Sequence, residues 1–154
     1  MRKIAVIGAG QMGTGIAQTV AANGMAVMLS DIDLAHAEAG KANVEKALVK
    51  LMGRGKIEAA EAEALLARIT PVADYAPMSE ADLIIEAATE REAVKNAIFE
   101  AAGKVLSADA IMASNTSSIP ITRMANHSPD PARFIGLHFF NPVPVMGLIE
   151  VIPG

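Results

Sequence analysis

The end of the chain carries two polar residues, a histidine and a glutamate, that could together move a proton. His138 lies in the apolar segment GLHFF, and Glu150 lies in LIEVI. If LIEVI is a strand, Leu148, Glu150 and Ile152 share one face, and the carboxylate needs a partner because an unpaired buried charge is costly. The turn-rich link of residues 140–147 could return Glu150 to the side of His138. A carboxylate that holds one imidazole nitrogen leaves the other to accept a proton near neutral pH. A structural ion pair is the alternative.

The beginning of the chain carries glycines that could hold a dinucleotide. The segment GAGQMG is a G-x-G-x-x-G motif between an apolar run and a segment without proline. In this motif the glycines allow a tight turn, a close approach of the backbone to a pyrophosphate, and close packing of helix on strand. The pyrophosphate lies on the N–H groups of the following helix. A purely structural turn is the alternative. The residues predicted to contact the cofactor here are Gly8, Gly10, Gln11, Met12 and Gly13.

Asp31 ends the next apolar run, close to the spacing at which an acidic residue receives the ribose hydroxyls in this kind of site. A 2′-phosphate at that position would meet a like charge, so NAD is favoured over NADP. The alternative for Asp31 is a helix N-cap, which either Asp31 or Asp33 could supply. Further along, Lys46 and Lys50 share a helix face with Arg54 and Lys56 nearby. Such charges usually form a solvated face, and the second interpretation is a patch for a phosphorylated substrate.

The elements that position these residues alternate between apolar runs and helical segments. The predicted strands are residues 4–7, 25–30, 70–72, 82–88, 110–114 and 134–139, with a last apolar run at 148–152. One predicted helix ends at Gly24, and three others cover residues 34–51, 57–69 and 90–106. A short helix is predicted to begin at Pro120. This order predicts an α/β fold, a Rossmann-type doubly wound, mostly parallel sheet with a helical-hairpin insertion after the second strand.

In open parallel sheets, ligands bind outside the carboxyl ends of the strands. The polar candidates follow strand ends: the glycine turn, Asp31, Glu90, Asn115 with Ser117, and His138. We therefore expect all of them on one edge of the sheet. A hydroxyl such as that of Ser117 would hydrogen-bond the reacting oxygen rather than act as a nucleophile.

The composition excludes several other classes of function. The chain has 154 residues, of which 52% are hydrophobic and 3% aromatic, so one aliphatic core is expected. A net charge of -4 without a basic stripe argues against a nucleic-acid partner. The absence of cysteine excludes disulfides and a thiolate metal site, and it fits a cytoplasmic protein. The apolar segment 134–154 contains His138, Glu150 and several prolines, so no membrane span is expected. No metal site is predicted.

Together, GAGQMG, Asp31, IIEAATERE, SNTSS and GLHFFNPVPVMGLIEVI resemble the L-3-hydroxyacyl-CoA dehydrogenases, including bacterial 3-hydroxybutyryl-CoA dehydrogenases. The resemblance covers essentially the whole chain. It implies that His138 is the general base, that Glu150 pairs with it, and that Ser117 contacts the substrate hydroxyl. It also implies residues for the cofactor and the substrate beyond those already named. These are Ala87, Glu90, Lys95 and Asn115 for NAD, and Asn141 and Lys50 for the substrate.

The resemblance implies hydride transfer between a 3-hydroxyacyl-CoA, such as 3-hydroxybutyryl-CoA, and NAD, as in fatty acid and butanoate metabolism. Members of the family continue into a helical C-terminal domain that completes the acyl-CoA pocket and forms a homodimer. We expect residues 1–154 to be the NAD-binding domain, with the helical domain absent from this chain, and the chain alone to be poorly active. Two alternatives stay open. One is an NAD-dependent dehydrogenase of a non-CoA 3-hydroxy acid or sugar acid, and the other is a non-catalytic NAD-binding module.

Overall fold

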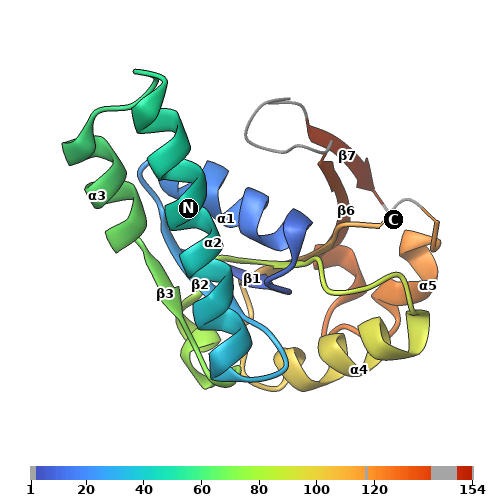
Figure 1. Ribbon diagram of the computed structural model, residues 1–154. Coiled ribbons are helices and arrows are strands. Elements are labelled where there is room, and N and C mark those ends of the chain that lie inside the picture. Colours follow the sequence, from blue (N-terminus) through green and yellow to red (C-terminus); the bar gives the residue numbers. More distant parts are fainter. Residues whose placement is uncertain (1–2, 117, 140–148, 154) are drawn as a thin grey trace.

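A seven-stranded sheet forms the centre of the fold, with the strands in the order β3-β2-β1-β4-β5-β6-β7 (Figure 1). The computed structural model describes residues 3–116, 118–139 and 149–153. Neighbouring strands from β3 to β6 are parallel, and β7 pairs antiparallel with β6. The fold is therefore the doubly wound, mostly parallel sheet that the sequence predicts. The strands are β1 Lys3–Ile7, β2 Ala26–Ser30, β3 Ile69–Pro71, β4 Leu83–Glu86, β5 Ile111–Ser114, β6 Phe134–Phe139 and β7 Ile149–Pro153.

Helices cover both faces of the sheet, which explains why its central strands are mostly apolar. Alternate residues of β1 enter two separate cores: Ile4 and Val6 pack under one layer of helices, and Ala5 and Ile7 pack under the other. The first layer is α1 Gln11–Ala22, α2 Leu34–Gly53 and α3 Ala59–Ala67; the second contains η1 Ala76–Glu80, α4 Glu92–Gly103 and α5 Ile121–Ala125, and η2 Pro131–Arg133 precedes β6 (Figure 1). No helix in the described ranges is long and apolar enough to cross a membrane.

The helical hairpin follows β2 as expected, but several boundaries differ from the sequence prediction, most of them by one or two residues. The helix α3 covers 59–67 rather than 57–69, since Arg68 is its C-cap and Ile69 pairs with Val27 of β2. As a result β3 lies one residue earlier than expected and ends at Pro71, which an edge strand tolerates. The helix α4 begins at Glu92 rather than 90, because Arg91 is its N-cap, and it ends at Gly103.

A close contact joins α2 to the turn after β1. A Cβ added to Gly40 of α2 would lie 2.7 Å from the Cβ of Ala9, which is closer than side-chain carbons approach. Gly40 therefore lets the helix pack directly on the turn. Since Ala9 lies inside the glycine motif, the hairpin is built onto the part of the fold that is predicted to hold the cofactor.

Candidate active site

The glycine turn between β1 and α1 leaves no room for side chains at two of its positions. Gly8 has a φ of 113°, and an added Cβ would lie 2.6 Å from the carbonyl oxygen of Ala87. An added Cβ at Gly13 would lie 1.6 Å from the carbonyl oxygen of Gly8. Gly10, by contrast, faces open space and is the N-cap of α1, with no side-chain cap. The first N–H groups of α1 are therefore available to an anion.

Asp31 and Asp33 have different partners, which separates the two roles that the sequence left open. Asp33 is the N-cap of α2, and its carboxylate accepts from the backbone N–H of His36 at 2.8 Å. Asp31 lies directly after β2, and its Oδ2 accepts from the backbone N–H of Ala9 at 2.7 Å. The half-buried carboxylate of Asp31 is thus held against the glycine turn, where a ribose-binding carboxylate is expected.

A pocket of about 270 Å³ opens where the carboxyl ends of β1, β4 and β5 meet. It brings together the glycine turn with the turns that follow β4 and β5, as parallel strands require. Six of the residues predicted to contact the cofactor line it. The lining residues are Gly10, Gln11, Met12, Ala87, Ala88, Thr89, Glu90 and Asn115.

Beneath this pocket lies a fully buried ion pair that the sequence analysis missed. Glu86 ends β4, Lys95 lies on α4, and both side chains are 0% exposed. The Lys95 ammonium donates to the two carboxylate oxygens of Glu86 at 2.6 and 2.8 Å. Ser114 Oγ and the backbone N–H of Ala88 also donate to this carboxylate, each at 2.7 Å. The signal was present, since a glutamate in the apolar run LIIE needs a partner for the same reason as Glu150.

In this structure the ammonium of Lys95 is held by the carboxylate of Glu86. Its described contacts are with the buried carboxylate of Glu86, so direct contact with a ligand would require the ion pair to rearrange. What the pair does in this structure is to join α4 to the ends of β4 and β5. The backbone of Ala88, which lines the pocket, is tied to the same carboxylate.

Two further polar side chains connect neighbouring strand ends at the pocket. Glu90 Oε2 accepts hydrogen bonds from the hydroxyls of Thr116 at 2.8 Å and Ser118 at 2.7 Å. Asn115 Oδ1 accepts from the backbone N–H of Phe139 at 3.2 Å. The turn after β4, the turn after β5 and the end of β6 are thereby linked along one edge of the sheet.

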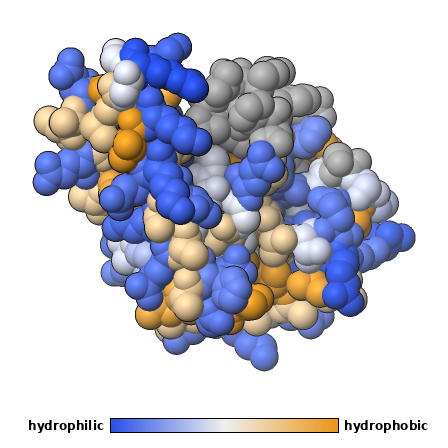
Figure 2. Space-filling view, viewed as in Figure 1, coloured by the Kyte–Doolittle hydropathy of each residue, from blue (hydrophilic) through white to orange (hydrophobic). Residues whose placement is uncertain are grey.

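His138 is the next-to-last residue of β6, at the same edge, and its partner across the β6–β7 ladder is Glu150. The prediction that the chain returns beside His138 is thus met by the backbone. Ser117 and Asn141 lie outside the described residues. Lys50 lies on the exposed side of α2 and, with Lys46 and Val49 among others, lines a shallow depression of about 460 Å³. Figure 2 shows hydrophilic and apolar residues intermixed over the hairpin.

Three ionisable groups near this edge have pKa values displaced from their ordinary ones. Burial raises the pKa of the Tyr75 hydroxyl, and the negative charges of Asp31 and Glu86 raise it further. Hydrogen bonds from the backbone and the ring of His36 lower the pKa of Asp33, and the same carboxylate raises the pKa of His36. Within the described ranges, no cluster of three or more His, Asp or Glu side chains could hold a metal ion.

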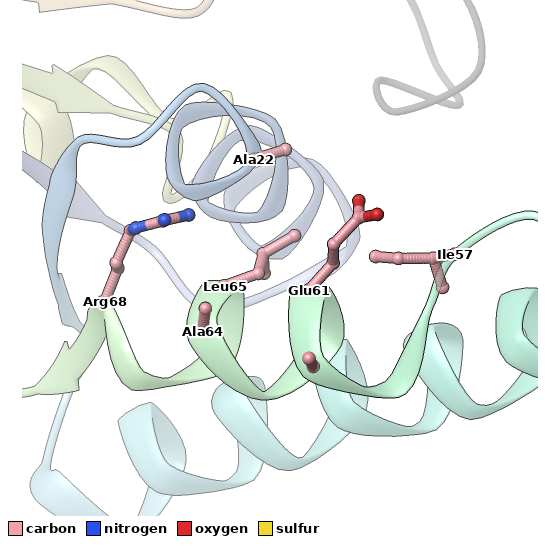
Figure 3. A pocket seen from close by; sticks show the side chains of 7 residues that line it. Ala22, Ile57, Glu61, Ala64, Leu65 and Arg68 are labelled. Carbon is pink, nitrogen blue, oxygen red and sulfur yellow. The ribbon is translucent and has the colours of Figure 1, made fainter.

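A second pocket, of about 380 Å³, lies between α3 and the end of α1 that is remote from the glycine turn (Figure 3). Its walls are mostly apolar, with Glu61 and Arg68 as the charged residues. The Arg68 guanidinium is already engaged, since it donates to the carbonyl oxygen of Ala21 at 2.7 Å. The residues of this pocket are Ala22, Ile57, Ala60, Glu61, Ala64, Leu65 and Arg68. It is separate from the polar edge described above.

Comparison with known proteins identifies the family of the chain. The family described as the NAD-binding domain of 3-hydroxyacyl-CoA dehydrogenase matches residues 3–154. A probable 3-hydroxybutyryl-CoA dehydrogenase of Deinococcus radiodurans is 47% identical over 152 residues, which cover 99% of this chain and 54% of the relative. A 3-hydroxybutyryl-CoA dehydrogenase of Bradyrhizobium diazoefficiens is 42% identical over 154 residues, which cover 100% of this chain and 53% of the relative.

The crystal structure of (S)-3-hydroxybutyryl-CoA dehydrogenase from Ralstonia eutropha is similar over the whole chain. Its TM-score is 0.97 at 42% sequence identity, and the match covers 100% of this chain and 54% of that one. The chain therefore spans about half the length of the relatives it matches.

Proposed function

The chain belongs to the 3-hydroxyacyl-CoA dehydrogenase family as its NAD-binding domain, and we propose that it serves an enzyme that interconverts 3-hydroxyacyl-CoA and 3-oxoacyl-CoA. 3-Hydroxybutyryl-CoA is the substrate that the names of the relatives favour. The observation that carries the proposal is the strand register, which places His138 opposite Glu150 in the β6–β7 ladder, at the sheet edge that also holds the glycine turn.

His138 is proposed to accept the proton of the substrate hydroxyl during oxidation. Loss of this proton together with the C3 hydrogen, as a hydride, would convert the C3–O bond to a carbonyl, and the bound cofactor would accept the hydride. Glu150 is proposed to orient the imidazole and to stabilise its protonated form. The backbone register supports this, because directly opposed residues of an antiparallel pair share a face of the sheet. NAD supplies the hydride-accepting chemistry when bound.

Several residues are proposed to hold the two ligands, the glycines through their backbone. For NAD these are Gly8, Gly10, Gln11, Met12, Gly13, Asp31, Ala87, Glu90, Lys95 and Asn115; for the substrate they are Ser117, Asn141 and Lys50. Asn115 has support beyond its place in the pocket, since its amide ties the end of β5 to Phe139, next to His138. The exposed Lys46 and Lys50, with Val49 between them, fit an acyl-CoA handle that combines phosphates with apolar groups.

We further propose that a helical domain beyond residue 154 completes the substrate pocket and forms a homodimer, and that the enzyme is cytoplasmic. The length of the relatives supports the first point, because the chain covers only about half of each. The chain alone should then bind NAD but turn over poorly. The absence of cysteine is compatible with a reducing compartment.

The test is the reduction of acetoacetyl-CoA by NADH, catalysed by the full-length protein that contains this chain. The loss of NADH absorbance measures the rate. His138→Ala should lower kcat by about 10²–10⁴-fold, as expected for loss of a general base. His127→Ala is the matched control, because His127 pairs with Glu100 on α4 rather than with the β6–β7 ladder. Equal rates for His138→Ala and wild type would contradict the assignment of the base. Turnover of free 3-hydroxy acids but not of CoA thioesters would contradict the substrate class.

A further inference from the structure

The order of the strands divides the edge of the sheet into an adenosine side and a nicotinamide side. Asp31 follows β2, the glycine turn follows the central β1, and Glu90 lies in the turn after β4 on the other side. If the ribose of the adenosine lies at Asp31 and the pyrophosphate at the glycine turn, the rest of the dinucleotide extends over the ends of β4 and β5. Glu90 and Asn115 line the pocket there.

The carboxylates on this nicotinamide side differ in how their charge is balanced. Glu86 is buried, and the Lys95 ammonium at 2.6 Å compensates its charge. Glu90 is exposed, and the groups that bond it are the hydroxyls of Thr116 and Ser118, both neutral. These hydrogen bonds fix one carboxylate oxygen without neutralising it. Glu90 therefore contributes a localised negative charge to the wall of the pocket.

The two oxidation states of the cofactor differ in charge at the group that this pocket would receive. The nicotinamide ring carries a positive charge in NAD and none in NADH, whereas the pyrophosphate charges are the same in both. A fixed negative charge beside the ring lowers the free energy of the oxidised form and leaves that of the reduced ring unchanged. We propose that Glu90 is a specificity-determining residue that favours the oxidised over the reduced cofactor. The inference rests on the family assignment of an NAD site to this edge.

The hydrogen bonds of Glu90 allow its charge to be removed with little change in shape. In Glu90→Gln, the amide oxygen has two lone pairs and can accept from both Thr116 and Ser118, as Oε2 does now. The turn after β5 should therefore keep its position. The matched control is Glu92→Gln, which removes the same charge from the first turn of α4, where Glu92 pairs with Arg123 at 2.6 Å.

The experiment is calorimetric titration of the 154-residue chain with NAD and with NADH, for wild type, Glu90→Gln and Glu92→Gln. The quantity compared is the ratio of the two dissociation constants, because repulsion between Glu90 and the phosphates affects both forms and cancels. In Glu90→Gln the preference for NAD over NADH should fall roughly three- to ten-fold, the range for one unit charge at a partly solvated site. Higher salt should reduce the difference. Glu92→Gln should leave the ratio unchanged.

An unchanged ratio in Glu90→Gln, with both forms still bound, would overturn this inference and leave the NAD site intact. A shift of the same size in Glu92→Gln would also overturn it, since the effect would then belong to net charge and not to position. A wild-type chain that binds neither form would overturn both the inference and the cofactor site.

Discussion

The buried pair of Glu86 and Lys95 makes a strong prediction about stability. In Glu86→Gln the Lys95 ammonium stays buried, at 0% exposure, without an opposite charge. Removal of one partner from a buried pair costs about 3–5 kcal/mol. The amide also cannot replace the carboxylate, because its NH₂ group cannot accept and four hydrogen bonds now converge on the two oxygens. Glu86→Gln should therefore lose at least this much of the free energy of unfolding.

Lys95→Met should be less harmful, since the carboxylate keeps the Ser114 hydroxyl and the Ala88 N–H as donors. The double variant Glu86→Gln/Lys95→Met places two neutral side chains of similar length in the same space. Replacement of a whole buried pair by apolar residues of similar volume is often close to neutral in stability, and this variant removes both charges while it keeps one polar amide. We therefore expect the double variant to be more stable than Glu86→Gln by about 2 kcal/mol or more, within the range of couplings between residues in contact.

The assay is urea unfolding followed by far-UV circular dichroism, because the chain has no tryptophan and one tyrosine. A typical domain has about 5–15 kcal/mol to lose, so each variant should still show a folded baseline or a clearly shifted midpoint. Additive losses in the double variant would refute the reasoning, because the pair would then not be coupled. The NAD affinity of the folded double variant also tests whether Lys95 contacts the cofactor.

Three further predictions concern the edge of the sheet. Gly13→Ala should abolish NAD binding or folding, since its Cβ would lie 1.6 Å from a carbonyl oxygen. Gly10→Ala should fold normally, because there is open space around Gly10. Circular dichroism measures folding and calorimetry measures NAD binding, so the two together separate loss of folding from loss of binding. Asp31→Ala should weaken NAD binding about ten-fold or more, the range for a hydrogen bond to a charged group, and should narrow the preference over NADP; a wild-type preference for NADP would contradict the role of Asp31. The lowered pKa of Asp33 adds stability that is fully present above the unfolded value of 3.8 and is lost as pH falls through the folded pKa. The raised pKa of His36 adds stability that is fully present below the unfolded value of 6.5 and is lost as pH rises through the folded pKa. Asp33→Ala should therefore lower the thermal midpoint most between these two values, and an equal loss at pH 5 and pH 8 would argue against the pair.

The sequence predicts the fold well where the pattern is local. Apolar runs bounded by glycine or aspartate locate the central strands, and the carboxyl-end rule then places the glycine turn, Asp31, Glu90 and His138 at one edge. The same reasoning cannot decide between partners that compete for one position. Asp31 and Asp33 are both plausible caps, and they are separated only by their observed partners, the His36 N–H for Asp33 and the distant Ala9 N–H for Asp31.

What the sequence did not predict depends on distant contacts. Ser114 and Lys95 meet Glu86 from different elements, so no spacing in the sequence indicates the network. The observed end of α3 differs from the predicted one because Ile69 pairs with β2. A helical pattern of residues does not show the stabilisation that such strand pairing supplies. The antiparallel pairing of β7 with β6 likewise cannot be deduced from the composition of LIEVI alone.

The seat of α2 on the glycine turn has a consequence for protein engineering. Gly40 and Ala9 leave no space between the helix and the turn, so a side chain added at Gly40 on the inner surface of α2 would displace the loop that is predicted to hold the dinucleotide. The outer surface, with Lys46 and Lys50, is free of this restriction. One helix thus has an outer face that is open to redesign and, at Gly40, an inner face that must stay unaltered.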